Sequence, residues 1–471
     1  MNRSCSRLAA AASNVLSQHT AKNGERVVVL GSGWAGFNVA LNLNKDVPLT
    51  VVSPRNHFLF TPLLPSASVG TLESRCIQEP VRTILGPNGS FLHAKARALD
   101  TEKKQVHCES IHDDKFAIDY DKLVISVGVK TNTFGMEDIK HDSQKGIFFL
   151  KSLSHARDIR TNIIDSFEKA AIPTVTEAER RRLLSFLVVG GGPTSCEFVA
   201  ELHDFVKKDV KRLYRDLLPY VKITLVEAGP ALLGPFDKAL QDYAHGLFQK
   251  RDIDVRLGTA VIGVEDYTEE GFINPARRAV FSDGSPPLPF GSMVWSAGLA
   301  PRTFTETLND QIERHPRTKR ILVDEYLRVK GHEGSIWAIG DAAVNEKGVA
   351  LPQLAQVARQ QGIYLSKVLN GTQREDEKPF EFFSLGSMAA MGEWKGVYDG
   401  SSIGPLKDPN DKNLKQQTGG DSRKPPKLTG LMALLLWRFA YWGRQTSIVN
   451  KILIPMYWFK AWLFGRDISR Y

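Results

Sequence analysis

The chain has 471 residues, a formal net charge of +9 and 42% hydrophobic residues. This length is too great for one hydrophobic core, so we expect two or three ordinary folded domains. Its four cysteines are far apart and form no CxxC pair, which argues against a disulfide scaffold, a zinc cluster and CxxC-type thiol–disulfide chemistry. The positive charge suits an anionic membrane surface or nucleic acid, but a basic targeting segment would also produce it.

The first 24 residues contain Arg3, Arg7 and Lys22, several serines and alanines, and no acidic residue. This composition is typical of a mitochondrial transit peptide, which forms a basic amphipathic helix. We therefore expect residues 1–24 to lie outside the fold. The alternative is an N-terminal tail without a targeting function.

A first nucleotide-binding unit is expected to begin with residues 25–150. A β-branched run over 26–31 is followed by a helical stretch and by a second strand. Between the first strand and the helix, Gly31, Gly33 and Gly36 fit the GxGxxG pattern. The first glycine allows a tight turn, the second lets a pyrophosphate approach the backbone, and the third lets the helix pack on the strand. The helix N-terminus then offers free N–H groups to the phosphates.

The second strand lacks the acidic residue that usually binds a ribose about 20 residues after the glycines. It ends instead with Ser53, Pro54 and Arg55. Ser53 could bind a ribose hydroxyl, and Arg55 could stack on adenine or meet a phosphate. Alternatively, Arg55 is a solvated turn residue. Without the ribose acid, this site suits FAD better than NADH.

A second unit of the same kind is expected over residues 151–320. Gly190, Gly191 and Gly192 form its glycine turn, followed by Pro193 and Thr194, and Ser195 takes the third glycine position. Glu227 closes the next strand. An acid there accepts both ribose hydroxyls of NADH and repels the 2′-phosphate of NADPH, so the pattern favours NADH. The alternative is a solvated strand end.

Glu197 is expected in the first turn of the helix that follows these glycines. It either complements the helix dipole or contacts the nicotinamide ring and orients it over a flavin. Its position in the sequence does not separate the two roles.

Residues 321–380 are expected to return to the first domain. The strand over 335–339 ends in Gly340 and Asp341, and a helix is expected over 351–369. In flavoproteins with two dinucleotide folds, such an aspartate holds the ribityl or pyrophosphate part of FAD.

The C-terminal region, 381–471, contains a polar stretch over 407–426 that indicates a flexible linker. Two apolar runs follow, 428–442 and 448–464, and neither reaches the roughly 18–20 uninterrupted apolar residues of a membrane span. Tryptophans and basic residues crowd both runs, which suits helices that lie in the headgroup layer. The alternatives are a dimer interface or buried core helices.

Over nearly all of 25–471 the chain resembles the mitochondrial type II (rotenone-insensitive) NADH:ubiquinone oxidoreductases. The segments that carry the resemblance are GSGWAGFNVALNL, SPRNHFLFTPLLPSASVGTLE, VVGGGPTSCEFVAEL, WSAGLAPR, WAIGDAA, LPQLAQVARQQGIYL, LGSMAAMG and FAYWGRQTSIVNKILIPMYWFKAWLFGRD. The FLFTPLLPSASVGTLE string and the C-terminal block are more specific to the family than either glycine turn. Ser195 replaces the family's usual glycine.

The resemblance implies an α/β fold with two Rossmann-like dinucleotide-binding domains and C-terminal membrane-associated helices. It implies non-covalent FAD, NADH as substrate, ubiquinone as partner, no metal and no nucleic acid. It also implies a monotopic homodimer on the mitochondrial inner membrane, with the face undetermined. The implied FAD contacts are Gly31, Gly33, Trp34, Gly36, Ser53, Pro54, Arg55, Thr61, Gly340 and Asp341. The implied NADH contacts are Gly190, Gly191, Gly192, Pro193, Thr194, Glu197, Glu227, Ala297 and Gly298, with Glu197 as the catalytic candidate.

Two glutamines, Gln356 and Gln360, are one helical turn apart and match the family's AQxxxQ pattern, which lines the quinone pocket. Otherwise they are two polar positions on a helix surface. The implied reaction passes hydride from NADH to FAD and two electrons on to quinone, without proton pumping.

Two other functions stay open. Sulfide:quinone oxidoreductases share the architecture but need a redox cysteine pair, which Cys76, Cys108 and Cys196 would supply only if folding brought two of them together. A flavoprotein that senses NADH and has a signalling or nucleic-acid-binding role is the non-enzymatic alternative, which the positive charge permits.

Overall fold

The computed structural model describes residues 24–269, 271–272, 276–308, 311–347, 351–405 and 426–469. The expected transit peptide and linker therefore lie outside the described residues, except for their last positions, Gly24 and Pro426. The chain forms two compact units. Unit 1 comprises the described residues within Met1–Phe58, Glu79–Lys130 and Ala300–Phe382, and unit 2 comprises those within Leu59–Gln78, Thr131–Leu299 and Phe383–Tyr471.

These units differ from the domain boundaries expected from the sequence. The chain leaves unit 1 after Lys130 and not at 150, and it returns at Ala300 and not at 321. From Phe383 on, the described C-terminal residues are part of unit 2, as is the segment 59–78, which contains most of the family-specific FLFTPLLPSASVGTLE string. Each unit is thus assembled from three separate stretches of chain.

Unit 1 is built on a seven-stranded sheet with the order β20-β8-β1-β2-β5-β6-β7. The pairs from β20 to β5 are parallel, and β6 and β7 extend the sheet as antiparallel strands. All four residues of β1 are buried, which fits its unbroken apolar run. The strands are β1 (Val27–Leu30), β2 (Leu49–Ser53), β5 (Gly89–Asp100), β6 (Gln105–Ser110), β7 (Lys115–Asp119), β8 (Lys122–Ile125) and β20 (Ile336–Ala338).

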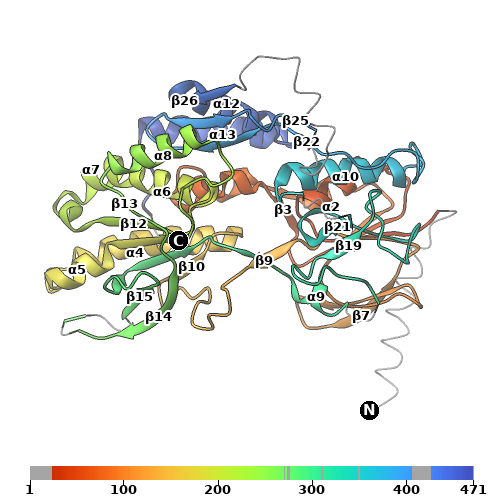
Figure 1. Cartoon of the computed structure of the whole chain (residues 1–471), viewed down its shortest axis with the longest axis horizontal. Coiled ribbons are helices and arrows are strands. Elements are labelled where there is room, and N and C mark those ends of the chain that lie inside the picture. The colour runs from red at the N-terminus through yellow and green to blue at the C-terminus, as the bar shows by residue number, and fades with distance from the viewer. Residues whose placement is uncertain are drawn as a thin grey trace, which may run out of the picture. The chain divides into compact units, whose positions relative to one another are not determined.

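Two helices of unit 1, α2 (Trp34–Asn42) and α10 (Ala355–Leu369), lie side by side (Figure 1). A Cβ atom on Gly362 would lie 2.6 Å from the carbonyl oxygen of Ala35. The close approach of the two helices therefore requires glycine at this position. This contact places α10, which comes late in the chain, directly on α2, the helix that follows the first glycine turn.

Unit 2 contains a five-stranded parallel sheet with the order β10-β17-β11-β12-β13 and a three-stranded antiparallel sheet, β14-β15-β16. A buried apolar cluster joins the two sheets, with Leu187, Val226 and Trp295 from the first and Phe281 and Phe290 from the second. The strands are β10 (Ile147–Phe149), β11 (Ser185–Val189), β12 (Lys222–Glu227), β13 (Asp254–Leu257), β14 (Val261–Tyr267), β15 (Ala276–Phe281), β16 (Leu288–Phe290) and β17 (Ser292–Trp295). The parallel sheet contacts α4 (Leu153–Ala170), α6 (Pro193–Phe205) and α8 (Lys238–Gln249).

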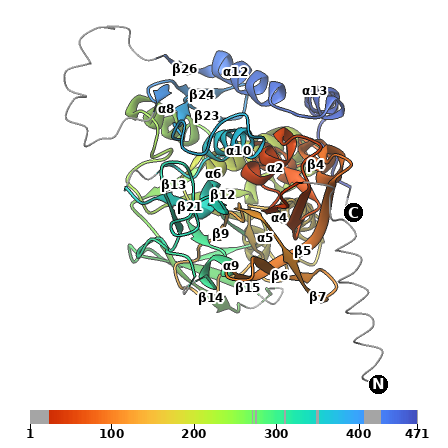
Figure 2. The same ribbon diagram turned by 90° about the vertical axis from the view of Figure 1, so that its right-hand side faces the viewer.

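The C-terminal part of unit 2 begins with an antiparallel sheet of β23 (Ser387–Ala390), β24 (Gly396–Asp399) and β26 (Lys427–Thr429). Helices α12 (Gly430–Gly443) and α13 (Ile448–Leu463) follow and contact each other at one end of the unit (Figure 2). A Cβ atom on Gly396 would lie 2.8 Å from the backbone nitrogen of Leu434, so α12 sits directly on β24.

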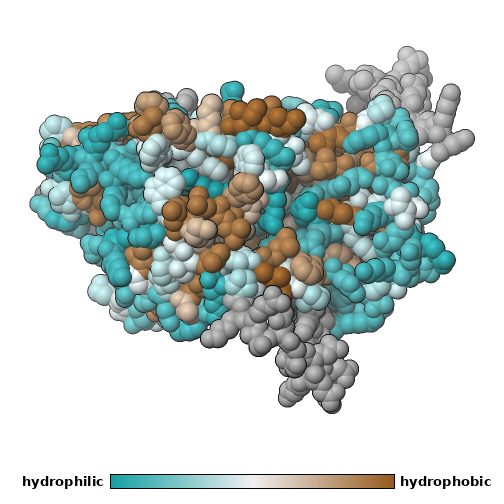
Figure 3. Space-filling model, turned by 90° about the horizontal axis from the view of Figure 1, so that it is seen from above, coloured by the Kyte–Doolittle hydropathy of each residue, from teal (hydrophilic) through white to brown (hydrophobic). Residues whose placement is uncertain are grey.

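Each of these two helices has a narrow buried face and a broad exposed apolar face. On α12, Ala433, Leu434 and Trp437 are buried, whereas Met432 and Phe439 are 65% and 72% exposed. On α13, Ile448 and Ile452 are likewise exposed. Apolar side chains are prominent on the surface seen from this end (Figure 3). Within the described ranges, no helix has the length and apolar character needed to cross a bilayer.

Candidate dinucleotide-binding sites

The first glycine turn connects β1 to α2 in unit 1. Gly31 has a φ of +110°, and a Cβ atom there would lie 2.5 Å from the carbonyl oxygen of Ser126. A Cβ atom on Gly36 would collide with the carbonyl oxygen of Gly31. At Gly33, the N-cap of α2, a Cβ atom would meet nothing within 4 Å, and no side chain caps the helix. The turn therefore leaves open space at the N-terminus of α2, as a pyrophosphate requires.

Ser53, at the end of β2, is tied into this turn. Its hydroxyl is buried, lies 2.9 Å from the hydroxyl of Ser32 and accepts a hydrogen bond from the backbone N–H of Arg55 at 3.2 Å. Ser53 therefore fixes the shape of the turn. Trp34 packs edge-on against Phe58 behind it, with ring centroids 4.9 Å apart.

Two partly buried arginines, Arg55 and Arg302, form a cationic cluster near this strand end. Burial and the charge of Arg302 lower the pKa of Arg55 to about 10, and burial also lowers the pKa of Arg302. Arg302 donates from Nε to the carbonyl oxygen of Val127 at 2.9 Å, and no carboxylate in the described part of the chain pairs with either guanidinium. Nε2 of His57, whose pKa is lowered by burial and by Arg55, is buried without a hydrogen-bond partner among the same residues. Arg55 is thus partly buried beside a second guanidinium, and the cluster fits an anionic, phosphate-bearing group.

The Gly340–Asp341 turn follows β20 in the same unit. Gly340 has a φ of +70° and donates its N–H to Oε1 of Gln361 at 2.6 Å. The carbonyl oxygen of Asp341 accepts from Nε of Arg320 at 3.0 Å and from Nε2 of Gln353 at 3.3 Å. Gln361, which the sequence pattern did not single out, therefore holds this turn on α10.

The two glutamines expected at a quinone pocket, Gln356 and Gln360, are half-buried on α10. With Gly31, Gly33, Gly36, Arg55 and Asp341 they all belong to unit 1. Thr61 does not, because it begins the short helix η1 (Thr61–Leu63) in unit 2.

The second glycine turn connects β11 to α6 in unit 2. Gly190 has a φ of +111°, and Gly192 is the N-cap of α6 with open space around it. Pro193 takes the first helical position, where an N–H is not needed, and Thr194 is exposed. The hydroxyl of Ser195 is buried 2.5 Å from that of Ser296, so the departure from glycine is accommodated by a hydrogen bond.

Glu227 folds back from the end of β12 onto this turn. One carboxylate oxygen, Oε2, accepts from the backbone N–H of Gly191, and the other, Oε1, accepts from that of Gly229 at 2.5 Å. Ala297, after β17, is in van der Waals range of Gly190, since a Cβ atom on Gly190 would lie 3.2 Å from its nitrogen. The glycines, Glu227 and Ala297–Gly298 therefore gather at the carboxyl ends of adjacent parallel strands, where dinucleotides bind.

Glu197 is not in the first turn of α6, and that expectation was wrong. The helix begins at Pro193, so Glu197 is its fifth residue, and the first turn has no acidic residue. Oε1 of Glu197 accepts from the backbone N–H of Ala390 at 3.0 Å and from Nε1 of Trp437 at 2.9 Å. Burial raises the pKa of Glu197 to about 8, so the carboxyl group is largely protonated at neutral pH. The distance of 240 positions between Glu197 and Trp437 hid this pairing from sequence reasoning.

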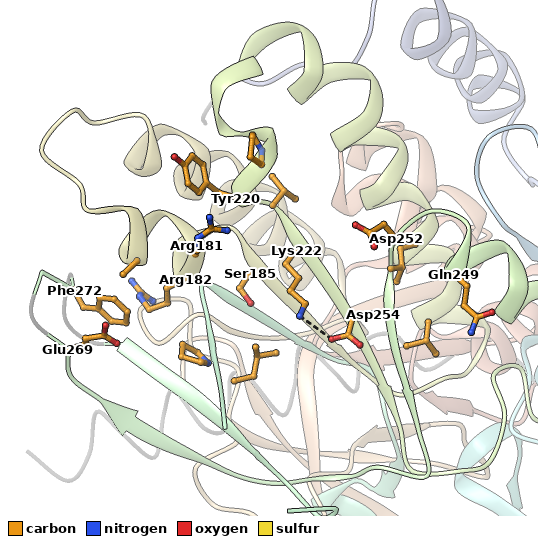
Figure 4. A pocket seen from close by; sticks show the side chains of 17 residues that line it. Arg181, Arg182, Ser185, Tyr220, Lys222, Gln249, Asp252, Asp254, Glu269 and Phe272 are labelled. Atoms are coloured by element: carbon orange, nitrogen blue, oxygen red, sulfur yellow. Dashed lines mark ion pairs between the residues drawn. The ribbon is translucent and has the colours of Figure 1, made fainter. Parts of the chain in front are cut away.

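A separate cavity of about 910 Å³ opens at the amino-terminal ends of the parallel strands of unit 2. Ser185, Lys222 and Asp254, the first residues of β11, β12 and β13, contribute to its lining (Figure 4). Lys222 pairs with Asp254 at 3.3 Å. Because this cavity lies at the amino ends of the strands, it is not the dinucleotide site.

The three described cysteines, Cys76, Cys108 and Cys196, are buried and free. Burial raises the pKa of Cys76 and of Cys108 to about 12 and also raises the pKa of Cys196. Cys108 belongs to unit 1 and the other two to unit 2. None of them has the exposed, low-pKa character of a reactive thiol.

Comparison with known proteins agrees with this arrangement. Residues 25–362 match the family described as pyridine nucleotide-disulphide oxidoreductase, and residues 418–467 match the NDH2 C-terminal domain. A probable NADH dehydrogenase of Dictyostelium discoideum is 37% identical, with 95% of this chain and 91% of that protein covered. The mitochondrial external NADH-ubiquinone oxidoreductase 2 of Saccharomyces cerevisiae is 34% identical, with 94% and 82% covered.

Among solved structures, NDH2 from Plasmodium falciparum in complex with NADH superposes with a TM-score of 0.82 at 26% identity, covering 95% of this chain and all of that one. The sulfide:quinone oxidoreductase of Aquifex aeolicus gives a TM-score of 0.65 at 18% identity, covering 94% and 96%. The latter is a likeness of fold alone.

Proposed function

Because the chain belongs to the pyridine nucleotide-disulphide oxidoreductase family, among its type II NADH:ubiquinone oxidoreductases, we propose that it oxidises NADH bound to unit 2, uses FAD bound to unit 1 and reduces ubiquinone. The observation that carries the proposal is the presence of two separate glycine turns, each with open space at a helix N-terminus. One has Glu227 beside it, and the other has Arg55 and Arg302, which pair with no carboxylate among the described residues, so the two turns suit different dinucleotides.

The residues of unit 1 fit FAD. The N-terminus of α2 faces the open space at Gly33, and no carboxylate in the described part of the chain pairs with the partly buried Arg55–Arg302 cluster. Bound FAD supplies the two-electron chemistry between a hydride donor and a quinone. The protein's part is to hold it non-covalently through Gly31, Gly33, Gly36, Arg55 and the Gly340–Asp341 turn. No cysteine or metal is required.

The residues of unit 2 fit NADH. Both oxygens of the Glu227 carboxylate already accept backbone N–H groups at the turn, and each has further lone pairs for the adenosine ribose hydroxyls. The negative charge disfavours the 2′-phosphate of NADPH. For Glu197 we propose an indirect role: its hydrogen bonds to Trp437 and Ala390 hold the C-terminal sheet and α12 against α6.

We further propose that ubiquinone is reached from a membrane surface. Gln356 and Gln360 on α10 are the candidate quinone contacts. The exposed apolar faces of α12 and α13, which include Phe439 and Ile448, suit insertion into the interfacial layer of a bilayer. Relatives named as mitochondrial support a mitochondrial location, and we propose a peripheral homodimer on the inner membrane.

The decisive experiment measures NADH oxidation by the purified full chain with added FAD and a short-chain quinone, and compares NADPH as donor. We expect quinone-dependent oxidation of NADH and a slower reaction with NADPH. NADH binding without quinone-dependent turnover would instead support the NADH-sensing alternative and overturn the proposal.

Sulfide oxidation is the less favoured enzymatic function. It needs two thiols that can form a disulfide near the flavin, whereas all three described cysteines are buried and their pKa values are raised. We expect no quinone reduction when sulfide replaces NADH.

A further inference from the structure

One aromatic residue beside the glycine turn of unit 2 has an unusual conformation. Phe134 has a φ of +53°, in the left-handed region, and is followed by Gly135 at +84°. A bulky residue in this region strains the backbone. The side chain is also 62% exposed, so burial of the ring does not compensate for the strain. The fold thus presents an aromatic ring to solvent in a conformation that glycine would adopt more easily.

Local hydrogen bonds hold Phe134 in this position. Its N–H donates to Oδ1 of Asn132 at 2.9 Å, and the N–H of Asn132 donates to the carbonyl oxygen of Gly298 at 3.3 Å. Nε1 of the buried Trp295 donates to the carbonyl oxygens of Asn132 and Ala297, both at 3.0 Å. The turn that carries the phenyl ring is therefore fastened to the end of β17.

The ring lies on Gly298. A Cβ atom on Gly298 would be 2.6 Å from Cζ of Phe134 and 3.0 Å from Cβ of Asn132. The ring centroids of Phe134 and Trp295 are 6.4 Å apart at 54°, so Phe134 covers the carboxyl end of β17 without being buried there. Because Gly298 has no side chain, the ring of Phe134 lies directly on its backbone.

The order of the strands indicates which half of a dinucleotide would reach this ring. β11, with the glycine turn, lies between β12, which ends at Glu227, and β17. Glu227 marks the adenosine ribose, and the open N-terminus of α6 marks the pyrophosphate. The remaining half of the molecule then extends toward β17, where Phe134 covers Gly298.

We infer that Phe134 is a positioning residue for the nicotinamide half of NADH, which packs against its exposed ring. This inference rests on the proposed function, since it requires NADH at the glycine turn of unit 2. Aromatic rings stack on flat, electron-poor heterocycles in offset geometry, which suits nicotinamide. The strained turn then serves to hold the ring at one fixed place before the ligand arrives.

The test compares two ligands that share an adenosine half. Calorimetric titration of the oxidised, FAD-loaded protein with NAD⁺ and with ADP-ribose measures binding without turnover, because ADP-ribose lacks the nicotinamide ring. Phe134→Gly is the main variant, since glycine relieves the positive φ and keeps the turn. We expect its Kd for NAD⁺ to rise about three- to tenfold, with the Kd for ADP-ribose unchanged and the thermal midpoint equal or higher.

Two further variants define the outcome. Phe134→Tyr keeps the ring and should bind NAD⁺ like the wild type, and Ile262→Ala, which removes another exposed apolar side chain of unit 2, should affect neither ligand. Equal weakening of both ligands in Phe134→Gly, or no weakening of either, would overturn the inference. If the wild-type protein binds neither ligand, it is the proposed NADH function that fails.

Discussion

Arg466 and Asp209 are joined by two hydrogen bonds, from the backbone N–H of Arg466 to Oδ1 and from Nη1 to Oδ2, both at 3.0 Å. The same guanidinium donates from Nη2 to Glu201 at 3.1 Å and from Nε to the hydroxyl of Thr71 at 2.8 Å. Arg466 is only 5% exposed and follows α13 closely in the chain. It therefore fastens the C-terminal end of the described chain to the helical segment of unit 2 that carries both acids.

Replacing Arg466 by methionine should destabilise unit 2 by about 3–5 kcal/mol, because the buried Asp209 would lose its ion-pair partner. Chemical denaturation of the FAD-loaded protein measures this loss. Arg181→Met is the matched control: its ion pair with Glu177 is more than half exposed and should contribute at most about 1 kcal/mol. Equal effects of the two substitutions would contradict the special role of the buried cluster.

Glu227→Gln should weaken the preference for NADH over NADPH. The amide cannot accept ribose hydroxyls as strongly as a carboxylate, and it no longer repels a 2′-phosphate. We expect the ratio of kcat/KM for the two donors to fall by about tenfold or more. Glu265→Gln, which removes an exposed acid of β14 in the same unit, should leave the ratio unchanged. An unaltered ratio in Glu227→Gln would mean that another group reads the adenosine ribose.

Substitutions of two glutamines of α10 should have different effects, one on quinone reduction and the other on retention of FAD. Gln356→Ala should slow reoxidation of the reduced enzyme by quinone and spare its reduction by NADH, both followed by stopped-flow absorbance. Gln361→Ala removes the acceptor of the Gly340 N–H and should instead lower the amount of FAD that survives gel filtration. If Gln356→Ala impairs both half-reactions equally, it is not a quinone contact.

Glu197 should make the stability of the protein depend on pH. Its pKa is about 8 in the folded state, above the ordinary 4.5, so between these values the folded state holds a proton that the unfolded state has lost. Stability conferred by the protonated form is therefore lost as pH rises through this window. Glu197→Gln retains the acceptor for Ala390 and Trp437 but does not titrate. It should gain roughly 1.4 kcal/mol on the wild type for each pH unit across the window.

Thermal midpoints measured from pH 5 to about pH 8 test this dependence. Glu265→Gln, which removes a half-exposed acid of β14, is the control and should keep the wild-type dependence on pH. Parallel pH profiles for the wild type and Glu197→Gln would show that Glu197 is ionised in the folded protein.

Substitution of the exposed apolar face should release the protein from membranes. Phe439→Glu should reduce co-sedimentation with vesicles of phosphatidylcholine and an anionic phospholipid, because the carboxylate opposes both insertion and attraction to the lipid. Activity with a short-chain quinone should persist. Ile262→Glu changes an apolar side chain that is 54% exposed on β14 and should bind vesicles like the wild type. Unchanged sedimentation of Phe439→Glu would place the membrane surface elsewhere.

Local sequence patterns predict the parts of these sites that depend on backbone conformation. The glycine turns at Gly31 and Gly190 are correct to the residue, because a tight turn between a strand and a helix leaves few alternatives. Glu227 is close enough to its own turn to be found by the same logic. The position of Glu197 was missed by one helical turn, since the sequence does not show that the helix already begins at Pro193.

Contacts between distant parts of the chain were not predictable. Nothing in the segment around Trp437 indicates a hydrogen bond to α6, and nothing near Arg302 indicates a second guanidinium close to Arg55. The transfer of the segment 59–78 to unit 2 is likewise a property of packing and not of local pattern. Such features depend on burial, which a single sequence shows only as hydrophobicity.

The two faces of α12 have a practical consequence for anyone preparing the protein without detergent. The residues that expose apolar surface, such as Met432 and Phe439, alternate with Ala433, Leu434 and Trp437, which pack on β24 or bind Glu197. Truncating the chain before α12 would therefore uncover the carboxyl group of Glu197 and the sheet that contains β24. It would also remove Arg466. A detergent-free version is better obtained by polar substitutions at the exposed positions than by truncation.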